Sequence, residues 1–515
     1  MLFFTKNGII LVEKNKESVE SEGFDMASNY TKIMYKDYEK IIEENEALKK
    51  ELKETKEKLK QTEKIASTQP QLIKEVEELK SLLADALLTI KMLKSQNEAL
   101  TEEVERLRSI INNDSNNSSI PPSQDKKSVK KSNEYNSRKK TTRKKGGQKG
   151  HHGRSMSHDD IQKILSTPGC EHIIKEVGKG ENYTSKYVID MKITPVVTEY
   201  RFYHSCPSGS FVSYGNNIKS IAVSLYGIGV MAFGRISSFI RDITDNVIKI
   251  SAGTLYSFCS NFSDKAITEI TKYEQYLQNQ SFLYTDGTNI TVNGDQQYIR
   301  NISNSHAVVY YPMERKNIET LNGIELLREY KGTLIHDHET ALYHFGLRHA
   351  ECNAHICRYL TKNSEDTGNG WSEEMKDFLE NAYIRKKEAI LEGKNSFSRE
   401  ELAEYTAIYD DIIKKAKIQN KGTKTKWAKQ DEMSLIRRME KYKENHLMFI
   451  YDFNIDYSNN VSERDLRKCK NRHKMSGGFR SENGCKMYCI ILSIIETAKR
   501  RNQSGFSAIK SVFAN

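Results

Sequence analysis

Long apolar runs and closely spaced cysteines are both absent from this sequence of 515 residues. No apolar stretch approaches the roughly 20 residues of a membrane-spanning helix, so we expect no membrane partner. The eight cysteines are scattered and lack the dense spacing of a disulfide framework, which suits a reducing cytosol. Only 37% of the residues are hydrophobic, so long segments must be solvated, and the length allows several domains.

Positive charge is present in excess and concentrated in one stretch. The net charge is +11, which suggests a polyanionic partner. Residues 126–154 contain many lysines and arginines against a single acid, Glu134, and cannot pack a core. We expect this arm to bind DNA with residues that include Lys139, Lys140, Arg143, Lys144, Lys145 and Lys149. A solvated linker is the alternative.

A heptad pattern predicts a coiled coil at residues 30–111. From Leu72 onward, apolar residues alternate at steps of three and four through Ile111. β-Branched residues and one Asn, Asn97, at the a positions favour a parallel homodimer. Pro70 marks a break from an earlier seam that is out of phase. A helix packed on its own protein is the alternative, and residues 1–29 read as a disordered leader.

Two predicted strands deliver aspartates to one place. Strand patterns cover residues 281–292, 297–303, 307–313 and 333–337, and a helical pattern covers 319–330. Three meandering strands, a crossover helix and a strand beside the first give the order of a ribonuclease-H-like core. Asp286 and Asp337 then meet on adjacent strands. Such a pair suits two Mg²⁺ or Mn²⁺ ions roughly 4 Å apart, as in phosphoryl transfer.

A third carboxylate is expected at Glu463. Two asparagines precede it as an N-cap, and the predicted helix is strongly basic, with Arg464 and Arg467, which we expect to bind DNA, beside the acid. A carboxylate in such a helix suits a site near phosphate. An ordinary ion-paired surface helix is the alternative, and Glu339 and Glu351 are rival third acids.

Five motifs resemble transposases of the insertion-sequence-66 (IS66) family, in the DDE group. The motifs are residues 118–123 (SSIPPS), 146–151 (GGQKGH), 352–358 (CNAHICR), 460–464 (NVSER) and 476–481 (SGGFRS). The resemblance implies cleavage and joining of DNA ends, with Asp286, Asp337 and Glu463 at the positions of the catalytic acids. Many members have Glu after the first Asp, where this chain has Gly287.

The resemblance also bears on the region before the acids. Relatives often carry a zinc ribbon where this chain has Cys170, His172 and Cys206, which are three ligands at most. We therefore expect a metal-free, β-rich relic at residues 158–216, with zinc unlikely. Residues 217–276 resemble a helix-turn-helix, although paired short helices often only pack.

Residues 352–358 have a Cys/His spacing without a partner cluster. A structural or DNA-facing role is therefore expected there, with His355 and Arg358 contacting phosphate.

Together these observations predict a multidomain α/β DNA transposase of the bacterial cytosol and nucleoid. Its expected parts are a leader (1–29), a coiled coil (30–111), a basic arm (112–157), a ribbon-like region (158–216), a helix-turn-helix-like region (217–276), a ribonuclease-H-like core (277–363 and 446–515) and an α-helical insertion (364–445). An inactive DNA-binding relic and a ribonuclease-H-like nuclease are the alternatives. The sequence leaves open whether accessory proteins of the same element are required.

Overall fold

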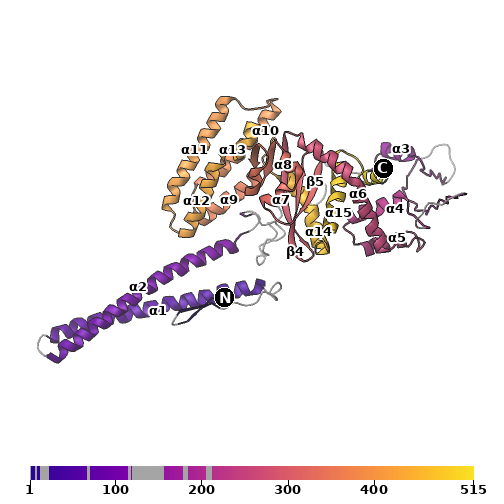
Figure 1. Cartoon of the computed structure of the whole chain (residues 1–515). Coiled ribbons are helices and arrows are strands. Elements are labelled where there is room, and N and C mark those ends of the chain that lie inside the picture. The colour runs from indigo at the N-terminus through magenta and orange to yellow at the C-terminus, as the bar shows by residue number, and fades with distance from the viewer. Residues whose placement is uncertain are drawn as a thin grey trace. The chain divides into compact units, whose positions relative to one another are not determined.

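The computed structural model describes residues 2–5, 8–11, 23–66, 70–113, 117–118, 156–177, 184–203 and 211–514. Two compact units make up the chain (Figure 1). The first consists of residues 1–112 with 424–428, and the second of residues 113–423 with 429–515. The predicted basic arm at residues 126–154 lies outside the described residues.

The first unit begins with a β-hairpin. β1 (Leu2–Thr5) pairs antiparallel with β2 (Gly8–Leu11), and helix α1 (Gly23–Ala66) follows. This differs from the disordered leader predicted for residues 1–29. The strand sequences LFFT and GIIL are rich in aromatic and β-branched residues, which favour a pleated strand.

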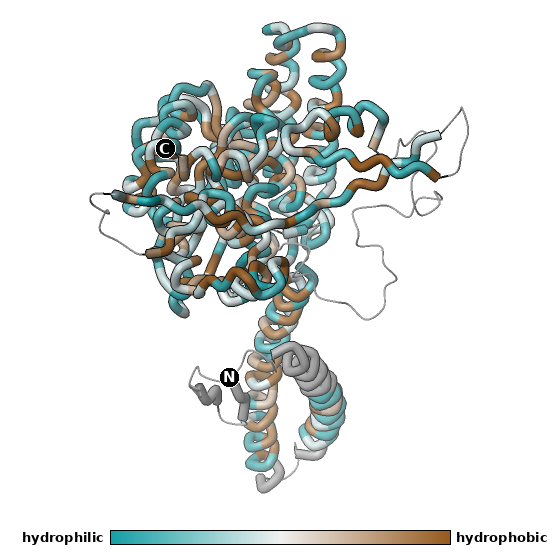
Figure 2. Tube along the Cα trace, turned by 90° about the vertical axis from the view of Figure 1, so that its right-hand side faces the viewer, coloured by the Kyte–Doolittle hydropathy of each residue, from teal (hydrophilic) through white to brown (hydrophobic). Residues whose placement is uncertain are grey.

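α1 and α2 (Pro70–Ile111) pack against each other within one chain. Leu59 and Val76 are buried together, and Lys80 Nζ lies 3.0 Å from Glu63 Oε1. Hydrophobic residues recur along α2 beyond this contact (Figure 2). Most of the later heptad positions are only half-buried. The start of the predicted heptad seam, at Val76, therefore packs against α1 of the same chain.

The second unit contains a five-stranded mixed sheet with the order β5-β4-β3-β6-β7. Its strands are β3 (Phe282–Val292), β4 (Asp295–Ser303), β5 (Val308–Met313), β6 (Thr333–His336) and β7 (Arg348–Glu351). β3, β4 and β5 form an antiparallel meander, whereas β6 and β7 run parallel to β3. Asn293 and Gly294, with φ of 53° and 92°, supply the left-handed turn between β3 and β4.

The predicted α/β class is confirmed: the chain is mostly helical around a small mixed sheet. β7 was not predicted, because its sequence RHAE has no apolar run. The helix predicted at residues 319–330 is two short helices, α7 (Ile318–Asn322) and α8 (Glu325–Glu329). Gly323 ends the first, and the extended backbone of Ile324 separates it from the second.

Helices before and after the strands in sequence pack on this sheet. α14 (Asn460–Ser476) contacts β3 and β4, and α15 (Glu482–Arg500) contacts β5. Further helices of the same core are α4 (Asn216–Gly227), α5 (Phe233–Asp242), α6 (Ala252–Gln278) and α16 (Gly505–Ala514). Leu255 and Phe262 of α6 are fully buried, so one face of this helix in the predicted helix-turn-helix-like region is used in packing.

Five helices between β7 and α14 have a hydrophobic core of their own. They are α9 (Asn353–Thr367), α10 (Trp371–Leu391), α11 (Arg399–Gly422), α12 (Lys426–Lys441) and α13 (Lys443–Tyr451). The buried carboxylate of Glu432 accepts hydrogen bonds from Trp371 Nε1 at 2.7 Å and Asn420 Nδ2 at 2.9 Å. This helical segment extends beyond the predicted limits 364–445 at both ends.

The region predicted as a β-rich relic contains one short helix, α3 (His158–Leu165). Among its described residues, 156–177, 184–203 and 211–216, none belongs to a strand. Apolar side chains such as Val188 and Val197 are exposed, so no second layer formed by described residues covers them. A strand needs a hydrogen-bonded neighbour, and the β-rich prediction is wrong for these residues.

Candidate active site

The sheet register brings the two predicted aspartates together. Asp286 lies within β3, and Asp337 directly follows β6. In the parallel ladder between these strands Tyr284 pairs with Ile335. Continuing that register by two residues places Asp286 beside Asp337, and the charge of Asp337 acts on Asp286. Two acids distant in sequence therefore share one location.

The two carboxyl groups have opposite pKa shifts. Burial and the neighbouring charge of Asp337 raise the pKa of Asp286 to about 6. Burial alone would also raise the pKa of Asp337, but hydrogen bonds and charge from His355 and Asn459 outweigh it and lower that pKa. This divergence is typical of like charges that share a site. A bound cation would relieve the repulsion.

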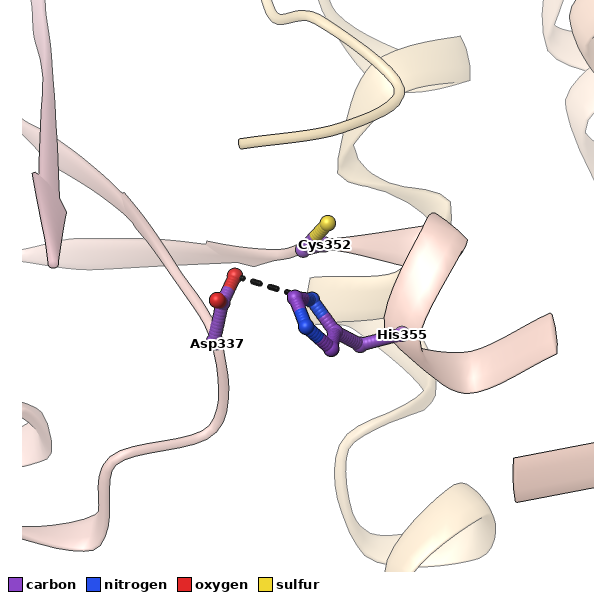
Figure 3. A group of neighbouring side chains, drawn as sticks. All are labelled: Asp337, Cys352 and His355. Atoms are coloured by element: carbon purple, nitrogen blue, oxygen red, sulfur yellow. Dashed lines mark ion pairs between the residues drawn. The ribbon is translucent and has the colours of Figure 1, made fainter. Parts of the chain in front are cut away.

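His355, in the first turn of α9, lies between Asp337 and Glu463. Its Nδ1 is 3.3 Å from Asp337 Oδ1, and its Nε2 is 3.9 Å from Glu463 Oε1. Figure 3 shows the imidazole facing Asp337, with Cys352 beside both. Burial lowers the pKa of His355, but Asp337 and Cys352 outweigh burial and raise it to about 11. His355 therefore lies between Asp337 of the aspartate pair and Glu463, the predicted third acid.

Asn459 connects the start of α14 to β3 and to the end of β6. Its Nδ2 donates to the Thr285 carbonyl at 3.0 Å and to Asp337 Oδ1 at 3.5 Å. Its backbone N–H donates to Cys352 Sγ at 3.2 Å. Asn459 occupies the predicted N-cap position, yet its side chain makes no cap hydrogen bond. Sequence reasoning recognised the cap and missed this cross-link.

Asn301 of β4 is a second cross-link, and nothing in the sequence pattern pointed to it. Its Oδ1 accepts from the backbone N–H of Asp286 at 3.1 Å. Its Nδ2 donates to Ser462 Oγ and Asp465 Oδ2, each at 3.1 Å. Ser462 directly precedes Glu463, so Asn301 fixes the position of α14 relative to Asp286.

Glu339, a rival third acid, is held by cations. Arg300 Nη2 donates to Glu339 Oε1 at 2.5 Å, and Lys316 Nζ lies 3.7 Å from Glu339 Oε2. Lys316 also donates to the Gly287 carbonyl at 2.8 Å. A Cβ at position 287 would lie 2.9 Å from Lys316 Cε, so glycine there leaves room for the lysine. Gly287, where many family members have Glu, is thus matched by the neighbouring side chain of Lys316.

Glu351, the other rival, is enclosed by partners. One oxygen, Oε1, lies 2.9 Å from His338 Nδ1 and accepts from Tyr343. The other, Oε2, accepts from Arg438 Nη2 at 2.7 Å and lies 3.4 Å from His446 Nε2. Burial would raise the pKa of Glu351, but His338, His446 and Arg438 outweigh it and hold the pKa far below its ordinary value.

The predicted DNA contacts fall into three groups. Arg464 and Arg467 are exposed on α14, and Arg358 on α9 is half-buried. His355 lies among the acids rather than on an open face. The arm residues Lys139, Lys140, Arg143, Lys144, Lys145 and Lys149 lie outside the described residues.

Of the three possible zinc ligands, two lie in the described part of the chain. Cys170 and His172 are both exposed, and Cys170 is a free thiol. Cys206 lies outside the described residues.

Comparison with protein families decides what kind of protein carries this geometry. Residues 214–487, more than half of the chain, match the model of the transposase IS66 family. The chain belongs to this family. Residues 67–157 of this IS66-family transposase match a second model, described as a family of unknown function (DUF6444). A search of curated proteins finds no match.

The donor chemistry of the acid cluster fits hard divalent cations. Asp286, Asp337 and Glu463 offer carboxylate oxygens, the ligands that Mg²⁺ and Mn²⁺ prefer. Asp337 and Glu463 keep 19% and 24% of their side chains exposed, so a cation and a substrate can reach them.

In the part of the chain that the structure describes, no helix is both long and apolar enough to cross a membrane.

Proposed function

We propose that this IS66-family transposase binds the ends of a mobile element and cleaves and joins DNA in a metal-dependent reaction. The observation that supports the proposal is that Asp286 lies beside Asp337, and that His355 lies between Asp337 and Glu463. Three acids on separate elements, β3, the end of β6 and α14, are brought to one location. A merely structural role would not require like charges to share a site.

The core is proposed to be ribonuclease-H-like. An antiparallel meander of β3, β4 and β5, followed by β6 and β7 parallel to β3, supports this assignment. In such an arrangement the acids lie on adjacent central strands. The five helices from Asn353 to Tyr451 then form an insertion between the second and the third acid.

The chemistry assigned to the acids is phosphoryl transfer. Two divalent cations, when bound, would activate the attacking oxygen and stabilise the leaving one. Asp286, Asp337 and Glu463 supply the oxygen ligands, and Asn459 and His355 hold Asp337 in place. Water first hydrolyses the strand at the element end, and the freed 3′-hydroxyl then attacks a target phosphodiester in line.

DNA would be held by basic surfaces next to the acids. Arg464, Arg467, Lys470 and Lys474 are exposed at helical spacing along α14, which also carries Glu463. A phosphate backbone lying along this helix would therefore reach the acids. The basic arm at residues 126–154 is proposed to add affinity that does not depend on sequence.

Dimerisation is proposed to use the half-exposed part of the α2 seam beyond Val76. Residues such as Ile90, Leu93 and Val104 would exclude water only when paired, with Asn97 fixing the register. Sedimentation of the full chain should show a dimer. Replacing Ile90 and Leu93 by lysine should yield monomers, and an unchanged dimer would contradict the role of this seam.

The purified chain should be incubated with labelled duplexes that carry the DNA flanking its gene, with Mg²⁺, with Mn²⁺, or with EDTA. The expected result is metal-dependent nicks with 3′-hydroxyl ends, followed by joining to a second duplex. Binding without cleavage would favour an inactive relic, and cleavage without joining would favour a nuclease.

A further inference from the structure

A second group of potential metal ligands, with softer donor atoms, lies beside the acid cluster. Asp337, Cys352 and His355 each offer one donor atom, and these three atoms lie within 4.8 Å of one another (Figure 3). The donors are an oxygen, a sulfur and an imidazole nitrogen. The Cys-x-x-His spacing alone has no partner ligand in the sequence, and the fold supplies one from another strand.

The backbone fixes these donors in place. β6 and β7 are parallel, with His336 paired to Glu351, so Asp337 and Cys352 are the next residues at the same edge of the sheet. The Cys352 N–H donates to the His336 carbonyl at 3.0 Å. His355 follows three residues later in the first turn of α9, on the same side as Cys352.

One pair of donor atoms already has the spacing of a tetrahedral site, and all three lie within 4.8 Å of one another. Bonds of about 2.0 to 2.3 Å at tetrahedral angles require ligand atoms roughly 3.5 Å apart. His355 Nδ1 and Asp337 Oδ1 are already 3.3 Å apart. Although Nδ1 is buried, it has no hydrogen-bond partner of suitable geometry among the described residues. A cation bound here would take the place of the proton that His355 Nδ1 directs toward Asp337.

We infer that Asp337, Cys352 and His355 form a binding site for a borderline-soft transition metal such as Zn²⁺, which competes with the proposed Mg²⁺ ions for Asp337. Sulfur and imidazole donors favour Zn²⁺ or Co²⁺ over Mg²⁺. Three protein ligands leave a fourth position for water. The thiol proton of Cys352 and one proton of the His355 imidazolium pass to solvent as the sulfur–metal and nitrogen–metal bonds form.

Occupation of this site would inhibit the enzyme, a consequence that rests on the proposed function. Asp337 cannot serve a zinc ion and the proposed Mg²⁺ pair in the same geometry. The binding itself does not depend on catalysis, so it can be measured separately.

The binding test is a Co²⁺ titration of the full, reduced, metal-stripped chain. Wild type should show a thiolate-to-cobalt charge-transfer band that saturates at one ion per chain and disappears on adding Zn²⁺. Cys352→Ser should lose the band, and Cys170→Ser and Cys357→Ser, which change an exposed and a buried thiol, should keep it. A band that survives in Cys352→Ser, or is absent from wild type, would overturn the site.

The activity test adds Zn²⁺ to cleavage reactions in excess Mg²⁺. The Zn²⁺ concentration for half-inhibition should rise roughly tenfold or more in Cys352→Ser relative to Cys170→Ser, since losing even a supporting residue weakens metal binding by about 10- to 100-fold. Equal inhibition of both variants would contradict competition at this site. If wild type fails to cleave DNA in Mg²⁺ alone, the proposed function fails, and the cobalt band still decides the site.

Discussion

Glu351 is a fully buried acid, the pair Asp286–Asp337 is partly buried, and these acids on or next to neighbouring strands have opposite surroundings. Glu351 meets His338, Tyr343 and two side chains from the helical insertion, and its side chain is fully buried. Asp286 meets another carboxylate instead, and its pKa is raised to about 6. The charge of Glu351 is balanced by its protein partners, whereas Asp286 has a neighbour of like charge, Asp337.

The contrast separates a structural acid from a candidate catalytic one. Breaking a buried ion pair leaves an unpaired charge, so Glu351 is tied to the stability of the fold. A carboxylate beside another carboxylate lowers stability and gains a favourable partner only when a cation binds. The same reasoning disfavours Glu351 as the third acid and favours Glu463, which keeps no strong cation of its own beyond His355 among the contacts described.

The largest expected effect is on catalysis. Asp286→Asn, Asp337→Asn and Glu463→Gln should each reduce strand cleavage to background, because an amide keeps the shape but cannot hold a divalent cation. A gel-shift assay on the same duplex should show that DNA binding survives. Glu440→Gln, in an exposed pair with Lys417, is the control that should cleave normally. Full cleavage by Asp286→Asn or Asp337→Asn would refute the site.

The next effect is on stability. Glu351→Gln should lower the free energy of unfolding by about 3 to 5 kcal/mol, the usual cost of removing one partner from a buried ion pair. Urea unfolding at neutral pH measures it. Glu440→Gln should cost about 0 to 1 kcal/mol, because its ion pair is solvated. Equal stability of the two variants would remove the distinction between the acid groups.

A smaller effect concerns DNA affinity. Each phosphate contact adds about 0.9 to the magnitude of the slope of log K against log salt, so Arg464→Gln with Arg467→Gln should flatten that slope. The matched control is Arg385→Gln, which changes an exposed arginine paired with Glu388 on the insertion. If both proteins keep the wild-type slope, α14 does not contact the backbone.

Much of the fold was visible in the sequence. Strands β3 to β6, the aspartate on β3 and the aspartate directly after β6 follow from local patterns, because β-branched and aromatic residues favour a pleated strand. β7 escaped notice because Arg348 and His349 interrupt its four residues. The split between α7 and α8 depends on the tertiary position of Ile324, which no helical periodicity reveals.

The site was less predictable than the strands. Asp286, Asp337 and Glu463 were identified as candidates, but the residues that connect them act through long-range contacts. Asn459 looked like a simple N-cap, and Asn301 had no signal at all. Side-chain partners across strands depend on register and on packing of α14, which the sequence does not specify locally.

The most direct test compares the Tm of wild type, Asp286→Asn and Glu351→Gln with and without Mg²⁺. Without metal, Asp286→Asn should be more stable than wild type by about 3 kcal/mol, since the pKa of Asp286 is raised by roughly two units and each unit is worth about 1.4 kcal/mol. Because burial and Asp337 raise the folded pKa of Asp286 from 3.8 to about 6, this advantage should be full above pH 6 and fade as the pH falls toward 4. Mg²⁺ should raise the Tm of wild type and of Glu351→Gln, but not of Asp286→Asn. An Asp286→Asn protein that is destabilised without metal, or that gains as much from Mg²⁺ as wild type, would contradict the metal-binding role of the aspartate pair.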